Sequence, residues 1–197
     1  MNKRQKRGFL LVLVGLVLVL SALGIHIAQQ REDEQAGQTA ALLLEQLEQK
    51  TQILPTQPET QKEEEADPAL PGKKYMDYTL IGTISIPSVD IRLPVLDDWS
   101  EKMLKVAPCR YAGSLSGGNM IIMGHNYKSH FTPLHGIKVG AEVSFENAQG
   151  VVYHYRVAEI AYLHRTEGEK LLSEYPLTVF TCTPGGLERI VVRCEAI

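Results

Sequence analysis

The chain has 197 residues and a mass of 21.9 kDa, which is room for one ordinary domain with accessory segments. Its net charge of −3 gives no global attraction for nucleic acid, and its 22% charged residues exclude a polytopic membrane protein. Three cysteines are too few for a disulfide scaffold. The charge is unevenly spread: residues 1–7 hold four Lys/Arg and no acid, residues 29–78 hold five Lys/Arg against eleven Asp/Glu, and residues 79–197 are nearly neutral.

The N-terminal segment has the pattern of a membrane anchor. Gly8–Ile25 is a run without charge, rich in Leu and Val, and its length as a helix is about 27 Å, close to the thickness of the hydrocarbon core. The basic residues 1–7 precede it, so the positive-inside rule keeps them in the cytoplasm. We predict a cytoplasmic segment 1–7, a single-pass signal anchor 8–28 and an extracellular remainder. A cleaved signal peptide, ending near Ala22–Gly24, is the alternative.

Residues 29–78 are rich in Gln, Glu and Pro and predict an acidic linker. Within them, Ala40–Leu54 carries enough leucines for a short amphipathic helix. That helix could pack on the domain, pair with a second copy, lie on the membrane or simply act as a tether. The prolines between Pro55 and Pro71 and the acidic run Glu63–Glu65 favour an extended spacer that holds a domain away from the membrane.

The remaining segment, residues 79–197, predicts an all-β domain. Short apolar runs alternate with turn signals, and one helix is expected near Glu101–Val106. Seven or eight short strands in one segment of this length favour a closed β-barrel with short helices. No nucleotide-binding motif is present. The expected strands include 80–86, 91–95, 120–123, 142–146, 151–161, 177–182 and 189–194.

Cys182 is a candidate nucleophile because it ends a strand at a Gly-rich turn. Catalysis needs the thiolate, so a cation should lie nearby. If strands 178–182 and 189–193 form a simple hairpin, Cys182 faces Arg189, while Arg193 faces Thr178 roughly 13 Å away. Arg189 is therefore the expected partner of the thiol.

A proton donor is also needed, and histidine is the usual choice near neutral pH. Six histidines are present. Only His125 directly follows an expected buried strand, at a Gly-His-Asn turn. The spacing of His125, His130 and His135 matches no zinc-binding pattern.

Thr178–Cys182, with the sequence TVFTC, resembles the TLxTC signature of sortases, with Val in place of Leu. Arg189–Val192 is similar to the strand that closes the sortase barrel, and Gly124–Asn126 resembles the segment that carries the family's catalytic His. The order His, Cys, Arg is the family's order, and the resemblance spans residues 79–197. The anchor and linker also suit a membrane-tethered sortase of a Gram-positive bacterium.

The resemblance implies an eight-stranded sortase barrel and a cysteine transpeptidase. Cys182 would cut an LPxTG-like C-terminal sorting signal of secreted proteins through a thioacyl intermediate, and a cell-wall or pilin amine would accept the acyl group. His125 would transfer protons, and Arg189 would hold the substrate and the oxyanion. Thr181 and Asn126 are the expected substrate-binding residues, and no cofactor or nucleic acid is expected.

The sequence leaves the subclass between class B-like and class D-like. Gly124–Tyr127 resembles class B, whereas Phe131–Leu134 with Ile137–Gly140 resembles class D. The chain stops soon after the last expected strand, unlike pilus-assembling sortases with a C-terminal membrane helix. Asp97–Trp99 resembles their lid motif only superficially, and we expect no lid.

A group of acidic residues and two further cysteines remain to be assigned in the sequence. The acidic residues Glu167, Glu169 and Glu174 could form a calcium site, but a solvated loop is the expected reading. Cys109 and Cys194 are expected to be buried free thiols, with a disulfide between them as the alternative.

Two other functions remain open from the residues. One is a non-enzymatic extracytoplasmic β-barrel that binds envelope components, which would leave the placement of thiol, His and Arg without a purpose. The other is a cysteine L,D-transpeptidase, but that family carries its His and Cys close together, whereas His125 and Cys182 are far apart in the sequence.

Overall fold

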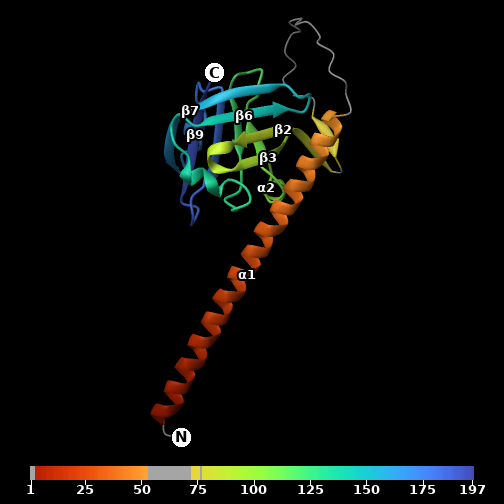
Figure 1. Cartoon of the computed structure of the whole chain (residues 1–197). Coiled ribbons are helices and arrows are strands. Elements are labelled where there is room, and N and C mark those ends of the chain that lie inside the picture. The colour runs from red at the N-terminus through yellow and green to blue at the C-terminus, as the bar shows by residue number, and fades with distance from the viewer. Residues whose placement is uncertain (1–2, 53–71, 76) are drawn as a thin grey trace, which may run out of the picture. The chain divides into compact units, whose positions relative to one another are not determined.

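The computed structural model describes residues 3–52, 72–75 and 77–197 (Figure 1). These residues form two compact units, 1–35 and 36–197. The helices and strands are α1 Lys3–Gln52, β1 Lys73–Tyr75, β2 Tyr78–Ile86, β3 Ile91–Leu96, α2 Glu101–Leu104, β4 Cys109–Ala112, β5 Met120–Met123, β6 Glu142–Asn147, β7 Val152–His164, β8 Leu177–Cys182 and β9 Glu188–Ala196, with 3-10 turns η1 Pro87–Val89, η2 Thr132–Gly136 and η3 Gly168–Leu171.

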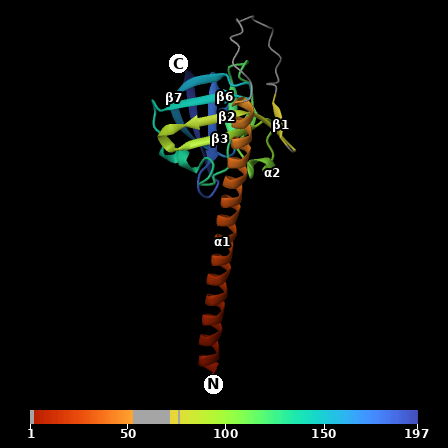
Figure 2. The same cartoon turned by 45° about the vertical axis from the view of Figure 1, so that its right-hand side comes forward.

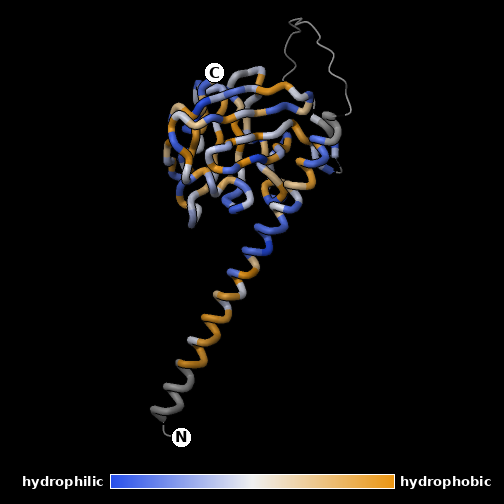
Figure 3. Tube along the Cα trace, viewed as in Figure 1, coloured by the Kyte–Doolittle hydropathy of each residue, from blue (hydrophilic) through white to orange (hydrophobic). Residues whose placement is uncertain are grey.

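The first unit is the N-terminal part of α1. Its large apolar side chains from Val12 to Ile27 are exposed, and Figure 3 shows this part of the helix as a mostly apolar stretch followed by a hydrophilic one. Among the described residues, the segment Val12–Glu48 contains a window long and apolar enough to cross a membrane, with a mean hydropathy of 2.2. By length and composition this helix meets the requirement for crossing a membrane, a requirement that a signal sequence also meets.

The second unit contains a closed eight-stranded β-barrel, as the sequence predicts. The strand order is β2-β3-β4-β5-β8-β9-β7-β6, and β6 pairs back with β2 to close the barrel. The short strand β1 pairs with the start of β2. The expected short helix is α2, whose first turn is capped by Ser100, since the Met103 N–H donates to its Oγ at 3.1 Å.

The strands that carry the site are buried on both faces. Val179 of β8 belongs to the barrel interior together with Ile190 and Val192 of β9. Phe180 points to the opposite face, where it packs in an outer cluster with Leu171 and Val191. Because successive residues of a strand face opposite sides, Cys182 shares the outer face with Phe180.

The C-terminal part of α1 packs on the barrel (Figure 2). Ala36, Ala40, Leu43 and Leu47 recur at helical spacing and are buried, whereas Leu42 is 60% exposed. The expected short helix is therefore the end of a longer one, and it packs on the domain. The spacer predicted after it falls largely on residues 53–71, outside the described part of the chain.

Candidate active site

The three candidate catalytic residues lie at one edge of the barrel. They belong to the neighbouring strands β8 and β9 and to the segment that directly follows β5. β5 runs parallel to β8 with Met123 opposite Phe180, and the Gly124 N–H donates to the Phe180 carbonyl at 3.1 Å. Continued by two residues, this register brings His125 level with Cys182. β8 and β9 are antiparallel, and Cys182 lies directly opposite Arg189, so the hairpin register predicted from the sequence is confirmed.

His125 and Cys182 both line a pocket of ≈ 290 Å³. Cys182 is half-buried, so its sulfur is accessible from the pocket. The lining is mostly apolar and comes from α2, from the end of β5 and the turn after it, and from the end of β8: Glu101, Leu104, Lys105, Met123, Gly124, His125, Asn126 and Cys182. A pocket with a thiol and an imidazole on its wall can hold a peptide carbonyl beside both groups.

The backbone at His125 is fixed by a close contact with an aromatic ring. A Cβ on Gly124 would lie 2.2 Å from the Phe131 ring, so only glycine allows this ring to cover the strand end. The Phe131 N–H also donates to the His125 carbonyl at 3.2 Å. The His125 ring stacks on Tyr127 with 3.8 Å between ring centroids, which restricts the orientation of the imidazole.

The two arginines of β9 have different surroundings. The Arg189 guanidinium carbon is 5.6 Å from the centroid of the Phe180 ring, on the outer face that Cys182 shares. Within the described residues, the buried Nε of Arg189 has no hydrogen-bond partner, and neither has the buried Nε of Arg193. Arg193 is engaged elsewhere: it binds Glu159 at 2.8 Å and the Lys170 carbonyl at 2.7 Å. Arg189 is thus the arginine available to an anion formed at Cys182.

The two expected substrate-binding residues lie in different environments. Asn126 lines the pocket, and its carbonyl accepts a hydrogen bond of 2.6 Å from the Thr132 hydroxyl. Thr181 is fully buried and, by strand alternation with Val179, faces the barrel interior. Its side chain lies behind the strand and is not among the residues that line the pocket.

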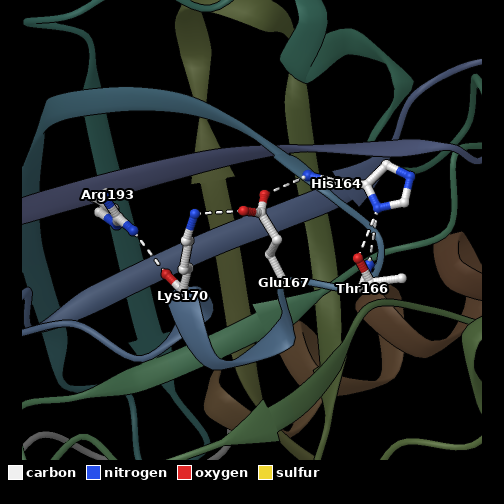
Figure 4. Close-up of polar contacts among 5 residues, drawn as sticks. All are labelled: His164, Thr166, Glu167, Lys170 and Arg193. Carbon is white, nitrogen blue, oxygen red and sulfur yellow. Dashed lines mark hydrogen bonds and ion pairs between the residues drawn. The ribbon is translucent and has the colours of Figure 1, made fainter.

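The loop between β7 and β8 is held by polar contacts (Figure 4). The Glu167 carboxylate accepts from the His164 N–H at 3.0 Å and pairs with Lys170. These contacts lower the pKa of Glu167 and raise the pKa of Lys170. The same loop reaches Arg193 through the Lys170 carbonyl. Among the described residues, no group of three His, Cys, Asp or Glu side chains could hold a metal ion.

The other two cysteines are separated from the pocket. Cys109 and Cys194 are buried and free, as expected. Burial raises the pKa of each thiol to about 12, so neither forms a thiolate near neutral pH. Cys182 is the accessible thiol of the three.

The helix α2 forms one wall of the pocket, which the sequence did not indicate. Glu101, Leu104 and Lys105 line it, although the sequence predicts a helix there. Asp97, by contrast, pairs with Arg110, and Trp99 packs on Tyr111 at a centroid distance of 5.4 Å. This segment is attached to the barrel surface next to β4.

Comparison with known proteins identifies a family. The family model of the sortase domain matches residues 84–197, while no curated protein sequence matches the chain. Sortase C1 of Streptococcus suis is 26% identical, with a TM-score of 0.54 over 60% of this chain and 73% of that one.

Two further solved structures share the fold. A lid mutant of sortase A from Corynebacterium diphtheriae is 24% identical, with a TM-score of 0.55 over 61% of this chain and 72% of that one. Sortase D5 of Clostridium perfringens is 19% identical, with a TM-score of 0.55 over 60% and 79%. These structures come from three sortase classes, so they single out no subclass for this chain. Since the family model spans more than half of the residues, the chain belongs to the sortase family.

Proposed function

We propose that the chain is a sortase transpeptidase in which Cys182 is the nucleophile, His125 the general acid and base, and Arg189 the oxyanion-binding residue. The observation that carries this proposal is the register of three adjacent strands: Cys182 at the end of β8 lies opposite Arg189 near the start of β9, and His125 follows the end of β5 at the same level. The pocket lined by His125 and Cys182 supports it further.

The reaction proceeds in two steps. The Cys182 thiolate attacks the carbonyl carbon of the scissile peptide bond, and the resulting oxyanion is held by the Arg189 guanidinium. The C–N bond then breaks, and His125 gives its proton to the departing amine, which leaves a thioacyl enzyme. In the second step an incoming amine attacks the thioester and loses a proton to His125, and the C–S bond breaks to restore the thiolate.

Of the two proposed substrate-binding residues, Asn126 contacts the substrate and Thr181 acts through the strand. Asn126, on the pocket wall beside His125, is placed to contact the peptide. Thr181 contributes indirectly, because its buried side chain fixes the strand beneath Cys182. The donor is a secreted protein with an LPxTG-like C-terminal signal, and the acceptor is a peptidoglycan-precursor or pilin amine. No metal or other cofactor takes part.

The N-terminal helix supports a location for this reaction. We propose that residues 8–28 cross the membrane once, with residues 1–7 in the cytoplasm and the barrel outside the cell. The exposed apolar side chains of this stretch and the basic residues before it support that topology. Donor proteins and cell-wall acceptors both meet such a domain on the outer surface of a Gram-positive bacterium.

The test is formation of the thioacyl intermediate. Purified protein is incubated with peptides of LPxTG, LPxTA and NPxTN types, and intact mass is followed for an adduct. We expect an adduct that Cys182→Ala abolishes and Cys194→Ala leaves in place. If no peptide gives an adduct although Cys182 reacts with a small alkylating reagent, the proposed substrates are wrong. If Cys182 is also unreactive in folded protein, a binding module replaces the enzyme.

A further inference from the structure

The pocket at Cys182 has two walls from separate parts of the chain. One wall is α2 with its flanking residue Lys105, and the other is the segment from Met123 to Asn126. α2 is only four residues long, and a single helical turn is not stable in isolation. The position of this wall therefore depends on what packs behind it.

The docked part of α1 packs behind the α2 wall. Leu43 and Leu47 share one buried apolar cluster with Leu104 of α2, and Met123 of the opposite wall packs against the same cluster. Leu104 and Met123 both line the pocket as well. The cluster thus links the docked part of α1 to both walls of the site through buried apolar side chains.

A second contact lies at Gly37, six residues before Leu43 on the helix. A Cβ on Gly37 would lie 2.9 Å from the Cβ of Ser129, so the helix backbone approaches this residue as closely as glycine allows. Ser129 belongs to the turn that follows His125, in which the His130 N–H donates to the Tyr127 carbonyl at 3.0 Å. The helix therefore also touches the turn that follows His125, the proposed acid and base.

The fully buried part of the docked helix is apolar. The ion pair between Glu48 and Arg92, at 2.7 Å, joins side chains that are about half exposed, and such pairs contribute little to stability. The fully buried residues of this part of the helix are Ala36, Ala40, Leu43 and Leu47.

We propose that residues 36–47 of α1 are positioning residues of the active site: they hold α2 and the turn after His125 in the arrangement that forms the pocket. This inference deepens the proposed function and depends on it for the reaction that is affected. It makes this C-terminal part of α1 a part of the catalytic unit, so that a barrel without these residues would fold with a poorly formed site.

The experiment uses the full chain in detergent micelles, with Leu43→Ala/Leu47→Ala as the test variant and Leu42→Ala as its control. Two quantities are measured: kcat and KM with the peptide found above, and the rate of Cys182 alkylation by iodoacetamide across a pH series. We expect kcat/KM of the double variant to fall about 10- to 100-fold, because small displacements of reacting groups are costly. We also expect its alkylation profile to shift along the pH axis. The conservative variant Leu43→Met should keep most of the wild-type activity. The kcat/KM of Leu42→Ala should stay within about twofold of the wild type.

A second pair of variants tests the contact between Gly37 and Ser129. If the double variant does not fold, Gly37→Leu tests the other contact by forcing the helix away from Ser129, with Gly24→Leu as control, since a Cβ there meets open space. A folded test variant whose kcat/KM and alkylation profile both match the wild type would overturn the inference. If the wild type cleaves no peptide, the proposed function fails, yet the alkylation profiles still decide whether the helix positions Cys182.

Discussion

The two arginines of β9 lie near opposite ends of the segment that pairs with β8, and the structure uses them in different ways. At one end, Arg189 lies opposite Cys182 with its guanidinium over Phe180 and without an ion pair among the described residues. At the other end, Arg193 binds the carboxylate of Glu159 and the backbone carbonyl of Lys170. The same side chain on one strand is thus available for chemistry at one end and committed to structure at the other. A residue type in a motif does not decide its role; the groups that face it do.

The largest effect is expected on kcat when Arg189 is replaced. Arg189→Ala should lower kcat by about 10²- to 10³-fold, as does loss of an oxyanion-binding donor in other enzymes, while the free energy of unfolding changes little. Peptide cleavage and urea unfolding measure the two quantities. Arg189→Lys keeps the charge without the planar fork and should recover only part of the rate. An Arg189→Ala enzyme with near-normal kcat would remove this residue from the site.

The next largest effect is expected on the free energy of unfolding when Arg193 is replaced. Arg193→Ala leaves the Lys170 carbonyl and Glu159 without their charged donor and should cost about 1–3 kcal/mol of unfolding free energy. Activity should fall less than in Arg189→Ala, because Arg193 reaches the site only through the loop it holds. A larger loss of kcat in Arg193→Ala than in Arg189→Ala, at equal stability, would reverse the two roles.

Glu159 should matter less than Arg193, because its side chain is 43% exposed and water can replace the arginine. Glu159→Gln should lower the free energy of unfolding by about 0.5–1 kcal/mol at low salt, and by less at high salt. A double-mutant cycle with Arg193→Ala isolates the pair. Glu195→Gln, on an exposed position of the same strand, serves as the control. A coupling energy near zero would mean that the Lys170 carbonyl alone accounts for the role of Arg193.

The hairpin of β8 and β9 could be predicted because its register follows from two apolar runs and the turn between them, and the contacts are local in the sequence. The docking of α1 could not: Leu43 fits a helix that packs on the domain, pairs with a second copy or lies on a membrane. The strand β4 was missed because its four residues, Cys109–Ala112, show no clear alternation. The sequence resemblance assigned Thr181 to substrate binding, whereas the structure places its side chain in the barrel interior. Long-range packing decides such cases, and a sequence does not display it.

The smallest effect concerns the loop that Arg193 holds. Hydrogen bonds from Lys170 and from the His164 backbone lower the pKa of Glu167 in the folded state. A carboxyl with a depressed pKa stabilises the fold above its unfolded pKa, and this contribution is lost as the pH falls below about 4.3. Glu167→Gln should therefore lower the melting temperature slightly at neutral pH and not at all in acid, because the wild-type carboxyl is then neutral too. Melting temperatures of Glu167→Gln and of the neighbouring Glu169→Gln across a pH series measure this difference. A Glu167→Gln deficit that is the same at every pH would show that the loop is held by Arg193 and the backbone alone, and that the charge of Glu167 adds nothing to the structural end of β9.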